Sequence, residues 1–213
     1  MWSLAEASGT RADYSGNANA LADNNTVTGA VGPSPIIPLA SKFTAANSES
    51  LSIADNASLS CGGGVPFWLH VWAYLDTTPA NIMWFISKDG DVTTEYNMGW
   101  DNTSGQMIFV TTAGSVLAAS GGTIATATWY MVDCWNNGVR SYVSISAGAI
   151  DSAANTGCTD TADVFGFGAA VGESVPRRFM DGRLAQGMMW KGYTPTPRDL
   201  KWLYNDGQGR PLF

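Results

Sequence analysis

Four large side chains alternate along one predicted strand and could together bind a ligand. They are Trp68, His70, Trp72 and Tyr74, and they lie opposite the aliphatic side chains of the same strand. Aromatic rings offer flat apolar area with polar edges, which suits stacking on sugars or anchoring a protein partner. The alternative is that the chain itself covers this face, with residues 9–40 as the cover. We therefore predict a partner-binding or glycan-binding surface at these four residues, provided that the face is open to solvent.

Catalytic chemistry has little support in the titratable residues. His70 is the only histidine, and it lies between two tryptophans with no acidic neighbour in sequence, which favours a packed or half-exposed sheet residue over a catalytic base. The nearest acidic pairs, Asp89 with Asp91 and Asp160 with Asp163, occur in turn-like sequence. We expect solvated loop carboxylates there, so the chain is predicted not to be an enzyme.

The cysteines do not follow a metal or disulfide pattern. Cys61, Cys134 and Cys158 are widely spaced and contain no CxxC pair, so we expect buried free thiols. The sequence leaves open whether Cys61 and Cys158 meet. A single histidine also excludes a histidine-rich metal site, and no metal ligands are assigned.

The charge distribution excludes one class of partner and indicates a second surface. The chain of 213 residues has a net charge of −7, whereas phosphate binding needs clustered Lys and Arg, so no nucleic-acid partner is expected. From Pro176 onward, seven basic residues stand against three acidic ones, a local charge of +4 that leaves −11 for the rest. We predict a docking region for an acidic partner at Arg177, Arg178 and Arg183. The alternative is ordinary solvation of one end of the molecule.

Targeting and membrane signals are not visible in the sequence. Residues 1–6 lack the basic start and apolar run of a signal peptide. No stretch approaches the length of a membrane span, so no membrane partner is expected. We expect a protein that is made and assembled in a cytoplasm.

The order of expected elements is that of an all-β protein with one short helix. Residues 9–40 are rich in Gly, Asn, Ala and Pro and are predicted to form a long wrapping loop. Strands are expected at 42–45, 50–54, 66–75, 82–88, 95–100, 106–112, 129–135, 139–146, 165–169 and 182–190. Asn136-Asn-Gly138 is a strong hairpin signal between two of them. Many short strands separated by turn signals predict a single domain over 1–213, an all-β antiparallel two-sheet jelly-roll sandwich.

The helix is expected over 196–206. Thr196 can cap its N-terminus, Pro197 suits the first position, and Asp199 favours the helix dipole at the third. An apolar face is expected from Leu200, Trp202 and Leu203, with the helix ending near Gly207.

Several segments together form a recognisable family pattern. They are Leu4-Ala-Glu-Ala-Ser-Gly-Thr10 with Asp13-Tyr-Ser-Gly-Asn17, the aromatic strand Pro66-Phe-Trp-Leu-His-Val-Trp72, the tryptophan strand Trp129-Tyr-Met-Val-Asp-Cys-Trp135, and the closing strand and helix over 179–190 and 203–209. In these segments the chain resembles the laminin G-like, concanavalin A-like jelly-roll family, in the variant common in bacteriophage and metagenomic proteins. The resemblance extends over nearly the whole chain and implies the fold more strongly than the function.

The resemblance also bears on catalysis and cofactors. Glucanases of this superfamily carry Glu-x-Asp-x-x-Glu on one strand, and this chain has no such run, which again predicts no enzyme. Calcium occurs in the superfamily, and the oxygen-rich loops Asp13–Asn17 and Asp89–Asp91 could supply ligands, but no other cofactor is implied. The family often has an acidic pair after the closing glycine, where this chain has Ala185 and Gln186, so a calcium-linked role there is not expected.

The resemblance implies a non-enzymatic structural protein of a bacteriophage virion, namely a decoration or cement protein on the capsid surface. Such a protein would bind the assembled shell, with the major capsid protein and copies of itself as partners, after assembly in the host cytoplasm. The alternative is a carbohydrate-binding adhesin or a receptor-binding tail or head fibre module, with a surface glycan as its partner. This alternative requires an open aromatic face.

Overall fold

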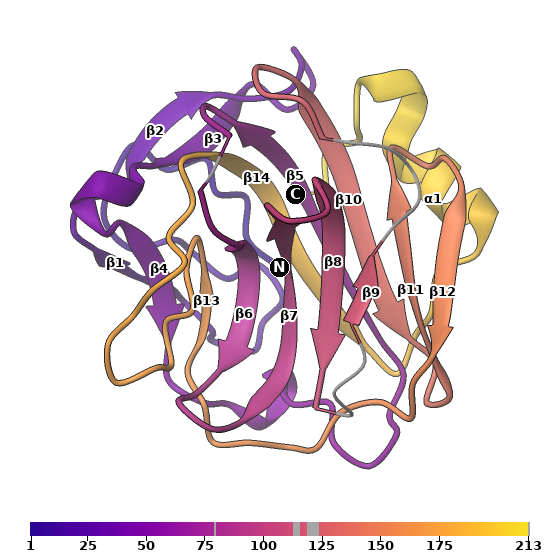
Figure 1. Cartoon of the computed structure of the whole chain (residues 1–213). Coiled ribbons are helices and arrows are strands. Elements are labelled where there is room, and N and C mark those ends of the chain that lie inside the picture. The colour runs from indigo at the N-terminus through magenta and orange to yellow at the C-terminus, as the bar shows by residue number, and fades with distance from the viewer. Residues whose placement is uncertain (79, 113–115, 119–123, 213) are drawn as a thin grey trace.

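The molecule is a sandwich of two antiparallel β-sheets. The computed structural model describes residues 1–78, 80–112, 116–118 and 124–212. In these residues each sheet has seven strands, and Figure 1 looks onto the first sheet with the second behind it. The predicted all-β, two-sheet architecture with one short C-terminal helix is confirmed.

The strands of the two sheets have the following spatial orders. The first sheet has the order β1 (Ala22–Asn24), β4 (Ser50–Ile53), β13 (Phe165–Phe167), β6 (Met83–Asp89), β7 (Thr94–Asp101), β8 (Gln106–Thr111) and β9 (Val116–Ala118). The second has the order β12 (Ile150–Ala154), β11 (Arg140–Ile145), β10 (Trp129–Asn136), β5 (Phe67–Leu75), β14 (Gly182–Lys191), β3 (Leu39–Phe43) and β2 (Thr28–Val31). The short 3₁₀ turns are η1 (Ala45–Asn47), η2 (Ala57–Leu59) and η3 (Asn205–Gly207).

The main core lies between the sheets and is built by alternation along the strands. On β5, the side chains of Phe67, Leu69, Val71, Ala73 and Leu75 are at most 2% exposed and belong to this core, as predicted. Burial of each of the four larger side chains, all but Ala73, stabilises the fold by roughly 1.5–3 kcal/mol relative to leaving it in water.

The prediction of one continuous loop over 9–40 is wrong in part. Two short strands, β1 and β2, lie inside this range, and the strand expected at 42–45 begins at Leu39. The prolines exclude a strand only between β2 and β3, where Pro33, Pro35 and Pro38 lie. Because β1 and β2 are short edge strands with no fully buried side chain, their sequences show no alternation between apolar and polar residues.

Two further strands were not expected from the sequence. Both β9 and β12 are the last strands of their sheets. In β12 the side chains alternate only between exposed and half-buried, and most of them are small. An edge strand with so little apolar area lacks the signal by which strands are recognised.

The predicted hairpin and helix both form. Asn137 closes the β10–β11 turn by accepting hydrogen bonds from the backbone N–H groups of Val139 (3.1 Å) and Arg140 (2.8 Å), and Gly138 has the positive φ of 90° that this turn requires. Helix α1 (Pro197–Tyr204) begins with a capping box in which Thr196 and Asp199 bond each other's backbone N–H groups.

The end and the apolar face of α1 differ from the prediction. The helix ends at Tyr204 because Asn205 takes a left-handed conformation, φ 47°, two residues before Gly207. Leu200 and Leu203, three residues apart, are buried against the second sheet, whereas Trp202 lies off this stripe and is 54% exposed. Its ring instead lies 5.3 Å from the Arg210 guanidinium.

Candidate functional site

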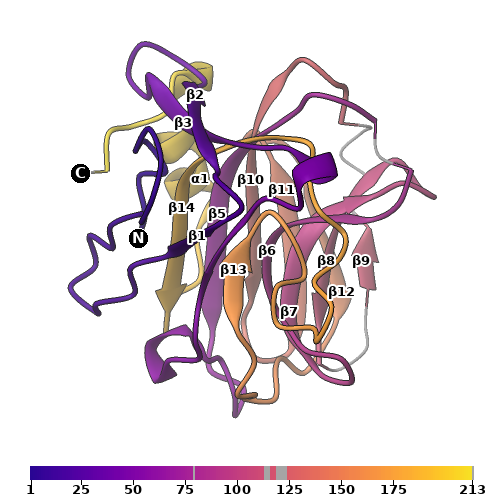
Figure 2. The same ribbon diagram turned by 90° about the vertical axis from the view of Figure 1, so that its left-hand side faces the viewer.

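The aromatic face predicted to bind a partner is covered by the chain itself. Trp68, His70 and Trp72 are at most 3% exposed, and Tyr74 is half-buried. Helix α1 lies on the outer side of the second sheet (Figure 2). Its apolar side chains, with Ile37 and Leu212, pack in one cluster with Trp68 and Trp72. The open surface that a glycan would need at these four residues is therefore not present in this structure.

Trp68 and His70 on this face share one bonding partner within the protein. Asp133 lies opposite His70 in the β5–β10 register, and its Oδ1 lies 2.8 Å from His70 Nδ1. The same oxygen accepts a 2.8 Å hydrogen bond from Trp68 Nε1. The acidic partner of His70 is 63 residues away in sequence, which is why the sequence did not reveal it. All three side chains are buried, so this arrangement joins strands rather than presenting a catalytic base.

The predicted basic region is divided between two environments. Arg183 lies with its guanidinium 4.4 Å from the Tyr74 ring and donates a 3.0 Å hydrogen bond to Asp76. Arg177 and Arg178 line an open groove at the end of the sandwich. These two arginines therefore belong to a hollow that could hold a ligand, whereas Arg183 is held by residues of β5 and the turn after it.

This end groove has a volume of about 930 Å³ and is formed by loops that connect strands of both sheets. It lies where β3 and β5 end and β6 and β14 begin. Its polar lining consists of Thr44, Thr77, Thr78, Asn81, Asn102, Arg177, Arg178 and Asp181. Half-buried Ile82 and Phe179 add apolar area. The end groove thus combines hydrogen-bonding groups with apolar contact area.

Several polar side chains of the end groove are held by neighbours and yet reach solvent. Arg177 forms an ion pair through Nε with Glu173, while its side chain remains 57% exposed. Asp181 accepts a 2.8 Å hydrogen bond from the Thr77 hydroxyl. Asn102 Nδ2 donates a 2.6 Å hydrogen bond to the Ala80 carbonyl. These contacts limit side-chain freedom, so less conformational entropy is lost when a ligand binds.

Most of the groove residues were missed by the sequence analysis. Thr77 and Asn81 lie between β5 and β6, Asn102 follows β7 and Asp181 precedes β14, and such residues are common in turns and loops for purely local reasons. Only the excess of basic residues after Pro176 indicated a binding region in the sequence, and this region includes Arg177 and Arg178.

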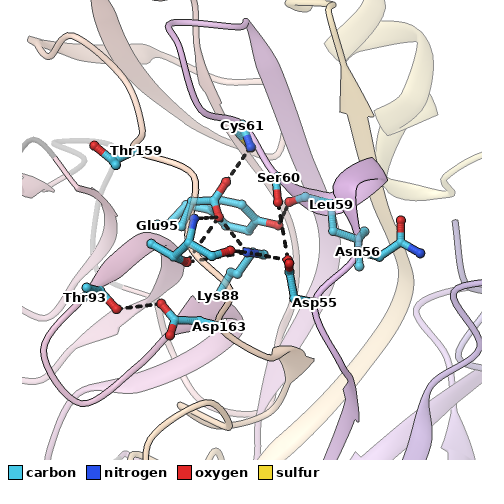
Figure 3. A network of polar contacts seen from close by, with 12 residues as sticks. Asp55, Asn56, Leu59, Ser60, Cys61, Lys88, Thr93, Glu95, Thr159 and Asp163 are labelled. Atoms are coloured by element: carbon cyan, nitrogen blue, oxygen red, sulfur yellow. Dashed lines mark hydrogen bonds and ion pairs between the residues drawn. The ribbon is translucent and has the colours of Figure 1, made fainter.

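The opposite end of the sandwich contains a network of charged side chains built around buried Lys88 and Glu95 (Figure 3). Lys88 Nζ lies 2.7 Å from Glu95 Oε2 and 2.9 Å from Asp55 Oδ1, and the side chains of Lys88 and Glu95 are fully buried. Burial alone would lower the pKa of Lys88, but Glu95 and Asp55 outweigh it and raise the pKa above its usual value. Glu95 also accepts the backbone N–H groups of Cys61 and Thr161. The network therefore ties β6 and β7 to two loops.

A smaller pocket lies beside this network. It has a volume of about 620 Å³ and is lined largely by glycines and by residues 156–160, together with Lys191. Lys191 Nζ donates a 2.9 Å hydrogen bond to the Ala57 carbonyl. Unlike the end groove, this pocket therefore has its one lining cation bonded to the chain's own backbone.

The remaining predictions on metals and thiols concern the described residues only. The three cysteines are free and buried, as expected. No group of three or more His, Cys, Asp or Glu side chains in the described ranges could hold a metal ion. No helix in the described part of the chain has the length and apolar character that crossing a membrane requires.

Comparison with solved structures identifies the fold. The chain is similar to the binding domain of Paraclostridial Mosquitocidal Protein 1, with a TM-score of 0.73 and 14% identity over 99% of this chain and 55% of that one. It is similar to domain 4 of AbnA, a GH43 extracellular arabinanase from Geobacillus stearothermophilus in complex with arabinotriose, with a TM-score of 0.63 and 15% identity over 92% of this chain and 98% of that one. It is also similar to the binding domain of botulinum neurotoxin serotype D, with a TM-score of 0.67 and 13% identity over 96% of this chain and 51% of that one.

These likenesses show the fold alone, because the sequence identities are low. The concanavalin A-like jelly roll predicted from the sequence is confirmed. The chain spans about half the length of the two toxin structures, and that it forms one domain over 1–213 stays a prediction. No family model matches the sequence, and no curated protein matches it.

Proposed function

We propose that this protein is a non-enzymatic carbohydrate-binding domain that holds a surface glycan in the end groove. The observation that supports this most is the groove itself, an open hollow of about 930 Å³ lined by amide, hydroxyl, guanidinium and carboxylate side chains. Sugar hydroxyls both donate and accept hydrogen bonds, so they need donors and acceptors close together. Asn81 and Thr78 are exposed and offer both.

The apolar lining suits the other half of sugar recognition. A sugar ring has C–H faces that lose contact with water when they pack on apolar or aromatic side chains. Phe179 and Ile82 are half-buried in the wall of the groove and supply such area. The aromatic face of the second sheet is covered, so the open aromatic face expected for a carbohydrate-binding protein is not found, and the proposal assigns the glycan to the end groove instead.

The acidic residues support binding without hydrolysis. Glycoside hydrolysis uses two carboxyl groups on either side of the scissile bond. Among the described residues that line the end groove, Asp181 is the only acidic one. The acidic turns near β6 are engaged elsewhere: Asp163 accepts a 2.8 Å hydrogen bond from Thr93, and Asp91 accepts one of 2.8 Å from the backbone of Ser174.

The solved structures with the same fold are consistent with a binding role. Two of those named above are binding domains of toxins, and the third is an arabinanase domain in complex with arabinotriose. None of these three is a virion protein, so the narrower expectation of a capsid decoration protein that contacts a major capsid protein has no support from them. Its virion location likewise stays a prediction.

A glycan array followed by affinity measurements on the strongest glycan tests the proposal. We expect Asn81→Ala and Asp181→Asn to weaken binding about 3- to 10-fold each, the effect of losing one hydrogen bond. Matched controls are Asn17→Ala and Asp206→Asn, which change exposed residues outside the groove. Equal affinities for the groove variants and the controls would contradict the proposed site, and no binding to any glycan would contradict the function.

A further inference from the structure

We propose that the end groove selects glycans that carry an anionic group, a carboxylate or a sulfate ester, and that Arg177 and Arg178 bind this group. This inference rests on the proposed function and adds the class of ligand. Guanidinium groups bind planar or tetrahedral oxyanions through paired N–H donors, a geometry that a neutral sugar does not offer.

Arg177 is held in a way that leaves its outer donors free. Its Nε atom is paired with Glu173, whose side chain is only 4% exposed, and the Arg177 side chain itself is 57% exposed. The two terminal nitrogens take part in none of the hydrogen bonds found among the described residues. The buried carboxylate thus fixes one edge of the guanidinium, and the opposite edge can donate to an anion with little loss of side-chain entropy.

Arg178 has a different anchor. Its guanidinium lies 5.6 Å from the centre of the Trp84 ring, a cation–π contact, and it forms no ion pair within the described ranges. The contact with the ring restrains the side chain and leaves its charge without a carboxylate partner. Arg178 therefore supplies positive charge that no neighbouring acidic residue neutralises by direct contact.

The backbone explains how two successive side chains reach the same groove. Along an extended segment, neighbouring side chains point to opposite sides. Arg178 has a φ of 60°, which is uncommon for a residue other than glycine, and this turns the chain so that both arginines line the groove. The Arg178 carbonyl is fixed in this position by a 3.2 Å hydrogen bond from the backbone N–H of Trp84. A costly local conformation is thus maintained beside the groove that both arginines line.

The surrounding charges make this pair of arginines selective. Asp181 is the acidic residue in the lining, and it accepts a hydrogen bond from Thr77. Glu173 offsets much of the charge of Arg177, so attraction depends on the free edge of Arg177 and on the charge of Arg178. Because the chain has a net charge of −7, anions are disfavoured over most of its surface.

The test compares matched pairs of glycans that differ only in the anionic group. Sialyllactose is compared with lactose, and a sulfated disaccharide with its desulfated parent, at two salt concentrations. We expect at least one acidic member to bind 10-fold or more tightly than its neutral parent, with a difference that shrinks at high salt. A preference confined to sialyllactose would assign a carboxylate, and one confined to the sulfated sugar would assign a sulfate ester.

Variants of the arginines separate a specific site from general charge attraction. Arg178→Gln and Arg177→Lys should each bring the affinities for the acidic glycan and its neutral parent to within about twofold of each other, whatever either variant does to the binding of the neutral sugar. Arg177→Lys keeps a positive charge that can pair with the buried carboxylate of Glu173. This variant should therefore fold even if a neutral residue at position 177 prevented folding. The control is Arg140→Gln, at an arginine that hydrogen-bonds Ser152 and lies outside the groove. This variant should leave the preference for the acidic glycan unchanged.

Two negative outcomes have different meanings. Equal binding of the acidic and neutral members of every pair would overturn this inference and leave the proposed function standing. Absence of binding to all of the glycans, with thermal unfolding showing a folded protein, would overturn the proposed function as well.

Discussion

The two ends of the sandwich use positively charged side chains in opposite ways. At one end, Lys88 is fully buried and is bonded to Glu95, Asp55 and the carbonyl of Thr161. At the other end, Arg177 has a single ionic partner and remains 57% exposed. The difference shows that the number of bonds a cation makes within the protein, together with its burial, decides whether it stabilises the fold or remains available to a ligand.

The largest expected effect tests the structural side of this comparison. Lys88→Met leaves Glu95 buried without its cation, and we expect a loss of about 3–5 kcal/mol in the free energy of unfolding. Arg178→Gln, at the opposite end, should change that free energy by less than about 1 kcal/mol. Urea unfolding of both variants measures the difference. Similar losses in the two variants would show that the ends do not differ in the way described here.

A second prediction concerns the covered aromatic face, which the comparison treats as structural. Leu203→Ala removes a buried contact of α1 with the second sheet, and we expect the free energy of unfolding to fall by about 2–3 kcal/mol. Urea unfolding followed by the fluorescence of the nine tryptophans measures this loss. If the variant were as stable as the parent but bound glycans more tightly, the aromatic face would have to be considered as a second binding site.

A third prediction applies the same rule to a carboxylate. Burial alone would raise the pKa of Asp13, but hydrogen bonds from the backbone and hydroxyl of Ser15 and the backbone of Asn19 lower it to about 2. Asp13 therefore contributes stability that is present above its unfolded pKa of about 3.9 and is lost as the pH falls through about 2. Asp13→Asn should lower the free energy of unfolding by about 1–2 kcal/mol at pH 7 and by clearly less at pH 2, where about half of the folded molecules carry a protonated Asp13. A loss of equal size at both pH values would show that the charge of Asp13 is not responsible.

The smallest expected change in the free energy of unfolding is at the N-terminal cap of α1. Thr196→Ala removes one hydrogen bond acceptor from the first turn of α1 and should cost about 1 kcal/mol. Thr128→Ala is a suitable control because its hydroxyl is exposed and makes only a 3.5 Å contact with the Thr126 carbonyl. Thermal unfolding compares the two variants, and identical midpoints would contradict the role of the cap.

The sequence allowed the fold to be predicted wherever the signal is local. Alternation over Phe67–Leu75 identified the core face of β5, the turn at Asn137 and Gly138 identified a hairpin, and Thr196 identified the start of α1. The edge strands were missed because small, exposed side chains leave no periodic apolar pattern.

The candidate site could be predicted only in part, because it depends on contacts between distant segments. His70 meets Asp133 through strand register, and Lys88 meets Asp55, which lies outside the strands of the first sheet; no sequence motif indicates either pair. The prediction that the aromatic face binds a ligand needed knowledge of where α1 packs. Arg177 and Arg178 were identified by charge alone, whereas the turns that complete the end groove have ordinary turn composition.

The central claim is that the end groove, and not the pocket beside the buried network, holds the ligand. Chemical-shift mapping of the isotope-labelled protein with the glycan that binds most tightly in the array tests this directly. We predict that the largest shifts occur at Asn81, Asn102 and residues 177–179. Shifts concentrated at residues 62–64, residues 156–160 and Lys191 would place the ligand at the opposite end of the sandwich and contradict this account.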